Sequence, residues 1–165
     1  PGQAGGAGTR TGASMSAAGI RAATAIDLDA ILALEAQFPG DRMSRRSVRR
    51  FLQVPSARIW VAQPADASAP LGALVMLTRR GSTSARIYSV AVDPAARGRG
   101  LAKALVQQAE ASARAGGCQY MQLEVREDNT AARGLYAALG YQDRQQLVGY
   151  YDDGGDGLRL ERALV

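Results

Sequence analysis

The sequence predicts a mixed α/β (α+β) domain, in which about six to seven strands form a mostly antiparallel central sheet flanked by about four helices. Three observations carry this prediction. The chain has 165 residues and is 47% hydrophobic, which suits one ordinary domain. Short apolar runs bounded by Gly, Pro and Ser turns indicate strands. Longer segments with apolar residues at helical spacing indicate helices.

The N-terminal part is expected to hold a tail, one strand and two helices. Residues 1–14 are rich in Gly, Ala and Thr and lack apolar periodicity, which predicts a flexible tail that need not be native. Met15 is a natural candidate for the native start, so a single domain is expected over 15–165. The elements predicted here are a strand at 19–23, a helix at 25–37 ended by Pro39 and Gly40, and a helix from the Ser44 cap to 53.

The rest of the chain alternates strands with two further helices. An antiparallel meander is followed by one strand–helix–strand unit and a final hairpin around an acidic, Gly-rich turn. Trp60 is expected to be a core residue, and Cys118 a small buried thiol. The predicted strands lie at 58–63, 71–78, 85–92, 119–126, 141–151 and 158–164, and the helices at 100–115 and 129–139. The apolar face of the first of these helices is expected to hold Leu101, Ala104, Leu105 and Ala109.

Missing residue types narrow the chemistry. The chain has no histidine, which excludes a Ser-His-Asp triad, a histidine-bound metal and an imidazole base. One cysteine excludes an internal disulfide and a cysteine-cluster metal site, so no metal is expected and a reducing cytoplasm is the default location. Acid–base work must fall to Asp, Glu, Tyr, Arg, Lys, water or a chain terminus.

The net charge of +5 permits a nucleic acid, an anionic cofactor or an acidic partner. Lys103 is the one lysine, and the other basic residues are arginines, which suit bidentate phosphate binding or reflect a coding bias. No apolar run approaches the length of a membrane span, so no membrane partner is expected. One feature would support a nucleic-acid partner, the arginine cluster of Arg42, Arg45, Arg46, Arg49 and Arg50. Nucleic acid is not expected, because no aromatic residues are interleaved with these arginines. That cluster more simply solvates a helix or meets an acidic acceptor.

A Gly-rich turn between a strand and a helix carries the strongest chemical signal. In SVAVDPAARGRGLAKA, residues 89–104, Gly98 and Gly100 precede the predicted helix. Helix N-termini bind phosphate through free N–H groups, and glycines let the backbone approach the anion. No P-loop motif is present, and Lys103 occupies the third glycine position of a dinucleotide-binding motif. The turn alone therefore predicts either a pyrophosphate cradle or a tight structural turn.

Two sequence motifs that occur in the expected order make the interpretation of this turn more specific. RGRGLA, residues 97–102, matches the acyl-CoA signature [RQ]-x-x-G-x-[GA] of the Gcn5-related N-acetyltransferases, and LEVREDNTAARGLYAALGY, residues 123–141, also resembles that superfamily (GNAT). The resemblance runs from about residue 20 to 163 and implies the GNAT fold. VAVDP, LEVRxxN and the late Tyr150-Tyr151 pair most resemble the ribosomal-protein-alanine N-acetyltransferase type. Ala102 replaces a glycine that the signature leaves optional, and the basic stretch 42–50 puts the acceptor in doubt.

The resemblance implies acetyl-CoA as the cofactor. It implies that the strand end at Val90, Ala91 and Val92 offers backbone groups to the pantetheine and the thioester oxygen. Asn129 would contact the cofactor arm near the thiol. The residues that it implies around the pyrophosphate are Arg97, Gly98, Arg99, Gly100, Leu101, Ala102 and Lys103.

Two catalytic residues are implied by the same match. Tyr136 would be the general acid for the leaving thiolate, since a phenol with a reference pKa of about 10 is protonated at neutral pH. The alternative is an aromatic residue packed in the core. Glu124 would be the base that takes the amine proton, directly or through water. Its alternative is a partly buried carboxylate paired with an arginine such as Arg126 or Arg86.

Acceptor-binding residues are implied near the C-terminus. Tyr150, Tyr151, Asp152, Asp153 and Asp156 lie where relatives shape the acceptor groove, although the acidic stretch also suits a solvated turn. Tyr88 is a candidate for the same cleft, with core packing as its alternative.

The implied activity is an acetyl-CoA-dependent N-acetyltransferase of a protein or peptide amine, most of all an N-terminal one. An acetyltransferase of small-molecule amines and a non-catalytic acyl-CoA-binding module are the alternatives. The joint presence of Glu124, Asn129 and Tyr136 argues against the module. A monomer or a homodimer is expected.

Overall fold

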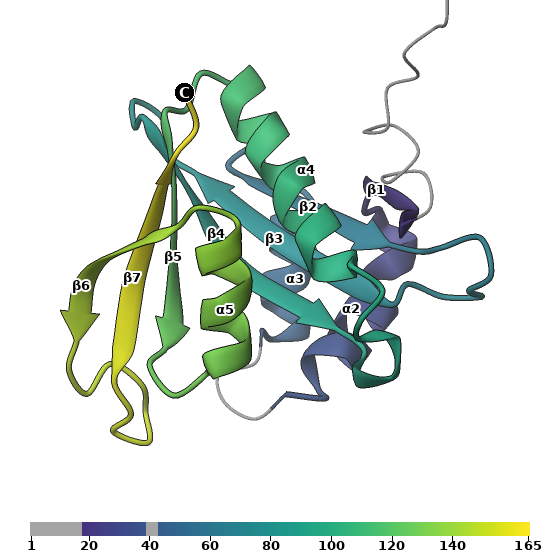
Figure 1. The fold of residues 1–165 in the computed structure, drawn as a ribbon. Coiled ribbons are helices and arrows are strands. Elements are labelled where there is room, and N and C mark those ends of the chain that lie inside the picture. Colours follow the sequence, from purple (N-terminus) through teal and green to yellow (C-terminus); the bar gives the residue numbers. More distant parts are fainter. Residues whose placement is uncertain (1–17, 39–42) are drawn as a thin grey trace, which may run out of the picture.

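The computed structural model describes residues 18–38 and 43–165. Its seven strands form one sheet in the order β1-β2-β3-β4-β5-β7-β6, with every neighbouring pair antiparallel except β4 and β5 (Figure 1). The strands are β1 (Ile20–Ala22), β2 (Ala57–Ala62), β3 (Gly72–Thr78), β4 (Ser84–Val92), β5 (Tyr120–Arg126), β6 (Gln142–Leu147) and β7 (Gly157–Ala163). The predicted mixed, mostly antiparallel sheet is confirmed.

Four α-helices cover the sheet in the described ranges. Helices α4 and α5 lie on one face, and α2 and α3 lie on the other behind β2, β3 and β4 (Figure 1). The predicted tail at 1–14, the start at Met15, the stop at Pro39 and Gly40, and Arg42 lie outside the described residues. The helical elements are η1 (Ala25–Asp27), α2 (Leu28–Glu35), α3 (Arg45–Phe51), η2 (Pro94–Ala96), α4 (Leu101–Ala115) and α5 (Thr130–Ala138).

The helix predicted over 25–37 begins instead as a 3-10 turn. Asp27 is buried there, and its carboxylate accepts two Arg21 bonds at 2.8 and 2.9 Å and the Thr24 N–H at 2.9 Å. These bonds hold the pKa of Asp27 below its usual range, the Arg21 hydrogen bonds being the main cause. The first turn is therefore tied to β1, and the α-helix starts at Leu28.

The sheet separates two apolar clusters. The larger lies under α4 and α5, and the buried Trp60 and the apolar face of α4 belong to it, as predicted. The smaller lies under α2 and α3 and draws on β2, β3 and β4, with no residue of β5, β6 or β7. Cys118 is half-buried against the larger cluster, so the predicted fully buried thiol is wrong: it lies in the connection just before β5.

The final hairpin folds with its second strand inside the sheet. β7 pairs with β5 on one side and with β6 on the other, so β6 is an edge strand. β7 buries Leu158 and Leu160, whereas nearly all of β6, sequence QDRQQL, is exposed. The strand predicted at 141–151 is shorter because a polar edge strand gains little by extending into solvent.

The two parallel strands pair over only part of their length. Ser84 to Ile87 of β4 face Tyr120 to Leu123 of β5, and pairing then stops. At the same point the β3–β4 register shifts, which leaves Tyr88 as an extra residue between Ile87 and Ser89. A bulge of this kind bends a strand and increases its twist. The C-terminal half of β4 therefore leaves β5, and its backbone on that side has no strand partner in the described residues.

A buried ionic group ties α4 to β7. The Glu110 carboxylate accepts the Tyr141 hydroxyl at 3.0 Å and two bonds from Arg162, each 2.8 Å. Burial and the Glu110 carboxylate raise the pKa of Tyr141, which keeps its hydroxyl a donor. Every charge in the group thus has a partner, as a buried carboxylate requires.

We expect Glu110→Ala to lower the free energy of unfolding by about 2–4 kcal/mol, because it leaves the buried Tyr141 hydroxyl and the Arg162 guanidinium without their acceptor. Asp66→Ala is the control, since it breaks an exposed ion pair with Arg99 and should change stability little. Denaturant unfolding followed by circular dichroism measures both. Equal unfolding midpoints for the two variants would contradict the structural role of Glu110.

Candidate active site

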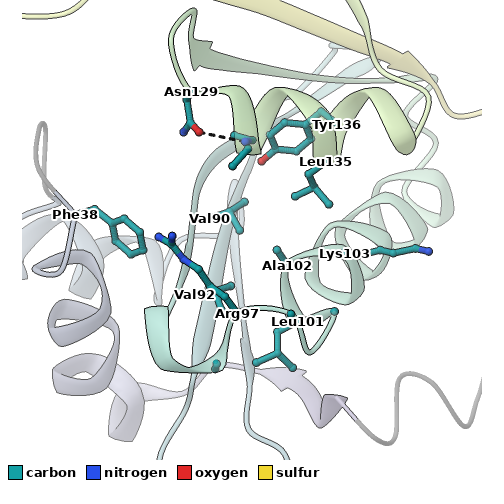
Figure 2. Close-up of a pocket in the computed structure, with 15 residues that line it drawn as sticks. Phe38, Val90, Val92, Arg97, Leu101, Ala102, Lys103, Asn129, Leu135 and Tyr136 are labelled. Atoms are coloured by element: carbon teal, nitrogen blue, oxygen red, sulfur yellow. Dashed lines mark hydrogen bonds between the residues drawn. The ribbon is translucent and has the colours of Figure 1, made fainter.

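A cavity of about 470 Å³ opens where β4 leaves β5 (Figure 2). Its walls come from the end of β4, the turn before α4, the first turn of α4, and α5. The residue that closes its far side, Phe38, follows α2. The lining residues are Phe38, Val90, Val92, Ala96, Arg97, Gly98, Gly100, Leu101, Ala102, Lys103, Asn129, Ala131, Ala132, Leu135 and Tyr136.

The turn before α4 has the backbone geometry of an anion-binding turn. Gly98 and Gly100 have φ values of +83° and +75°, which a β-carbon disfavours. A β-carbon on either glycine would meet no atom within 4 Å, so both face open space on the cavity side. The first N–H groups of α4 have no carbonyl one turn earlier and carry the positive end of the helix dipole. A phosphate group fits this arrangement.

Two basic side chains at this turn lie differently. Figure 2 shows Arg97 directed toward Phe38 across the cavity, whereas Lys103 extends away along the outside of α4. Arg99 does not line the cavity, because its guanidinium pairs with Asp66 at 2.9 Å. Arg97 is therefore the predicted cation best placed to meet an anion inside the cavity.

The end of β4 presents alternating side chains to the two faces. Val90 and Val92 line the cavity, while Ala91 packs in the cluster under α2 and α3. Ala91 can contribute only its backbone, which is what the predicted contacts to the pantetheine require. However, its N–H and C=O groups face its β3 partner Ala73, so the backbone groups of Val90 and Val92 are the ones that face the side where the pairing with β5 has ended.

Helix α5 supplies the two polar side chains of the opposite wall. The Asn129 Oδ1 accepts the Ala132 N–H at 3.1 Å and caps the helix, which leaves its amide nitrogen without a bond to another described residue (Figure 2). The Tyr136 ring is buried and packs edge-on against Tyr141, with centroids 5.4 Å apart. Its hydroxyl points into the space beside Val90.

Burial controls the protonation of Tyr136. Desolvation raises the pKa of this phenol well above its ordinary value, because burial penalises the phenolate. No residue in the described ranges forms a hydrogen bond with its hydroxyl. The group is thus a protonated donor directed at the cavity, and core packing and a catalytic role are both compatible with its position.

Glu124 lies on the other face of the sheet. β5 turns Leu123 and Val125 toward α5 and Glu124 away from it, so Glu124 is not part of the cavity wall. Its side chain is 10% exposed and paired on both oxygens: Arg86 Nε donates at 2.9 Å, and Arg159 donates from two nitrogens at 3.3 Å. The predicted alternative is an ion pair between Glu124 and an arginine such as Arg126 or Arg86, and the structure shows Arg86 in that place. The second partner is Arg159 and not Arg126, because Arg159 of β7 lies directly opposite Glu124 of β5.

The predicted acceptor residues gather beyond Glu124. Tyr150 and Tyr151 contact edge-on at 5.1 Å, and the Arg126 guanidinium lies 4.6 Å from the Tyr151 ring centre. Asp153 pairs with Arg126 at 2.6 Å. Asp156 accepts the Gly149 N–H at 2.8 Å, which uses one of its oxygens to hold the turn.

Tyr88 lies between these groups and α3. It is 45% exposed, so the core-packing alternative is wrong: the bulge at this residue turns its ring outward. Its ring packs edge-on against Phe51 at 5.5 Å.

Several cavity residues were missed by sequence reasoning. Phe38 is far from the motifs in sequence, and only its apolar character after a helix pointed to burial. Ala132 lies about one helical turn from both Asn129 and Tyr136, and Ala131 and Leu135 lie one turn apart beside it, so the helical spacing could have identified them.

Comparison with known proteins identifies the family. The model of the Acetyltransferase (GNAT) family matches residues 28–141, and the chain therefore belongs to this family. An uncharacterized N-acetyltransferase of Methanocaldococcus jannaschii is 40% identical over 75 residues, which is 45% of this chain and 48% of that protein. The match thus spans about half the length of this relative.

Two solved structures share the fold over most of the chain. The ribosomal-protein-S18-alanine N-acetyltransferase from Escherichia coli has a TM-score of 0.77 at 22% identity, covering 88% of this chain and 92% of that one. A NatC complex bound to a Gag peptide and CoA has a TM-score of 0.74 at 26% identity, covering 88% and 99%. The superfamily predicted from the two motifs is confirmed.

Neither a membrane-spanning helix nor a cluster of metal ligands occurs within residues 18–38 and 43–165. No helix in these ranges is long and apolar enough to cross a membrane. No cluster of three or more Cys, Asp or Glu side chains there could hold a metal ion.

Proposed function

We propose that the protein transfers an acetyl group from acetyl-CoA to a primary amine, most of all the N-terminal amine of a protein or peptide. One observation carries the proposal: the sheet opens between β4 and β5, with a turn suited to phosphate on one face and the arginine-paired carboxylate of Glu124 on the other. A cofactor and an acceptor can therefore approach the same gap from opposite sides.

The described residues fit acetyl-CoA. The amides of the first turn of α4 and the open space at Gly98 and Gly100 suit its pyrophosphate. Arg97 adds positive charge, and the free backbone groups of Val90 and Val92 can bond an amide-bearing arm as a strand would. When bound, acetyl-CoA supplies an acetyl group activated as a thioester.

Tyr136 is proposed as the general acid. Its hydroxyl is protonated because burial raises its pKa, and it points into the cavity beside Val90. It would give its proton to the departing sulfur. Asn129, with its amide nitrogen unused, would orient the arm next to it.

Glu124 is proposed as the group that takes the amine proton. Both of its oxygens already accept bonds from arginines, so removal of the proton through a water fits the structure better than direct contact. Arg86 and Arg159 hold the carboxylate in place. An α-amino group, with a reference pKa of about 8, needs less help to become neutral than a lysine at about 10.4. A single held carboxylate therefore suits an N-terminal acceptor.

A peptide acceptor is favoured over a small amine by the shape of the acceptor face. The region beyond Glu124 is open and extends over β7 to the two tyrosines. A peptide chain could contact several residues along this region, which a small amine is too short to do. The similar NatC structure holds both a peptide and CoA.

Glu124→Gln is expected to lower kcat/KM for a peptide about 10²-fold at neutral pH, within the usual contribution of a general base. The loss should shrink above the pKa of the peptide amine, because the amine is then neutral without help. Affinity for acetyl-CoA should not change. Glu161→Gln is the matched control, since Glu161 of β7 lies on the same face of the sheet as Glu124. Its carboxylate is also bonded, to Gln122 and Arg144. Equal peptide rates for the wild type and Glu124→Gln would leave Glu124 as a structural ion pair.

The activity itself is tested by calorimetric titration with acetyl-CoA and desulfo-CoA, followed by turnover on peptides that begin with Ala or Ser. Binding with turnover supports the proposal. Binding without turnover on any amine would indicate an acyl-CoA-binding module, and turnover confined to small amines would overturn the peptide acceptor.

A further inference from the structure

One half of a sheet face carries polar residues and is covered by no helix of residues 18–38 and 43–165. Helices α2 and α3 cover β2, β3 and β4, and the apolar cluster beneath them stops there. The same face of β5 and β7 presents Glu124, Arg126 and Arg159, because their alternate neighbours point toward α5. We call this open region, together with the adjoining α3, the acceptor face.

Positive charge exceeds negative charge at the centre of the acceptor face. Arg86 and Arg159 share the single carboxylate of Glu124, and their side chains are 42% and 36% exposed. Near Tyr150 and Tyr151 the charged side chains already pair with one another, since Arg126 forms ion pairs with Asp153 and with Asp128. The central arginines thus keep donors that Glu124 does not use.

Helix α3 extends this excess along one side. A series of contacts joins α3 to the centre: Phe51 packs on Tyr88 at 5.5 Å, and Arg86 lies 5.7 Å from the Tyr88 ring centre. Arg46, Arg49 and Arg50 are exposed on α3, and none pairs with an acidic residue of the described ranges. Arg45 differs, since it pairs with Asp29 at 2.8 Å.

We infer that the acceptor is a peptide whose residues after the N-terminus are acidic. Three exposed arginines on α3 that pair with no acidic residue of the described ranges, and two arginines that share one carboxylate, complement carboxylates and repel a basic chain. A nucleic acid is a poorer fit, because the carboxylates of Glu124 and of Asp153, which pairs with Arg126 of this face, would repel a continuous line of phosphates. The inference rests on the proposed function and adds the class of peptide.

The test compares three peptides that share a free N-terminal Ala and differ in the next three residues, which are acidic, neutral or basic. We expect kcat/KM to be at least about tenfold higher for the acidic than for the basic peptide, since several exposed charge pairs add up. The ratio should fall when ionic strength rises from about 0.05 to about 0.5 M, because salt screens exposed charges.

Two variants with the same change in charge locate the effect. Arg49→Gln/Arg50→Gln should reduce the acidic-to-basic ratio severalfold. Arg79→Gln/Arg80→Gln, in the turn between β3 and β4 at the opposite end of β4, should keep it. The ratio is taken within each variant, so a general loss of activity does not imitate the result.

Each other outcome overturns the inference. Acetylation of the neutral peptide without an acidic preference would leave the proposed function standing and remove the acidic acceptor. Failure to acetylate any peptide would remove both. Strong inhibition by duplex DNA with a steep salt dependence would assign the arginines to nucleic acid instead.

Discussion

Tyr136→Phe is expected to lower kcat about 10²-fold while the dissociation constant for acetyl-CoA stays nearly unchanged. The structure gives the reason, because the phenol is buried, protonated and directed into the cavity, and Phe removes only its hydroxyl. No bond from this hydroxyl to another described residue is lost, so the melting temperature should change little. Steady-state kinetics with a peptide acceptor and titration with acetyl-CoA measure the two quantities.

A second tyrosine provides the control for this variant. Tyr120 lies at the start of β5, at the end of the sheet away from the cavity, and is 37% exposed. Tyr120→Phe should therefore leave kcat unchanged. An equally active Tyr136→Phe enzyme would assign Tyr136 to core packing and leave protonation of the sulfur to water.

Gly100→Val is expected to weaken acetyl-CoA binding by roughly 10²-fold. The cause is steric, since the new side chain would enter the open space from which the first amides of α4 reach the pyrophosphate. Loss of one or two hydrogen bonds to a charged group has this magnitude. Titration of the variant with acetyl-CoA measures the effect.

The backbone strain of this substitution needs its own control, because Gly100 has a φ of +75°. Gly117, just after α4, has a φ of +89° and equally open surroundings, but it lies away from the cavity. Both valine variants should lose roughly 1–2 kcal/mol of stability to the left-handed backbone. Only Gly100→Val should lose the cofactor, and equal affinities would contradict the cradle.

The cradle could be predicted from sequence because its parts are contiguous. A strand, two glycines and a helix start within a short stretch determine where the first amides of α4 point. The direction of the Arg99 side chain could not be predicted in this way. Arg99 belongs to the same stretch, but its guanidinium pairs with Asp66 of a loop distant in sequence and does not line the cavity.

The proposed acceptor face is formed by pairs of residues that lie far apart in the sequence. Glu124 lies within the strand predicted at 119–126, and the alternation of side chains along a strand puts it on the face away from Leu123. Its partner Arg159 follows from β7 pairing with β5, which no local pattern specifies. The outward position of Tyr88 depends likewise on a bulge in the register with β3.

The sequence by itself determined the fold class, the order of strands and helices, the family and the position of the Gly-rich turn before α4, because periodicity and contiguous motifs encode these features. Only the tertiary structure decided which side chains share a space. It closed the cavity with Phe38, buried Tyr136 so that its pKa rises, and surrounded Glu124 with two arginines. The physical reason is that strand register and the parting of β4 from β5 are set by packing across the whole sheet.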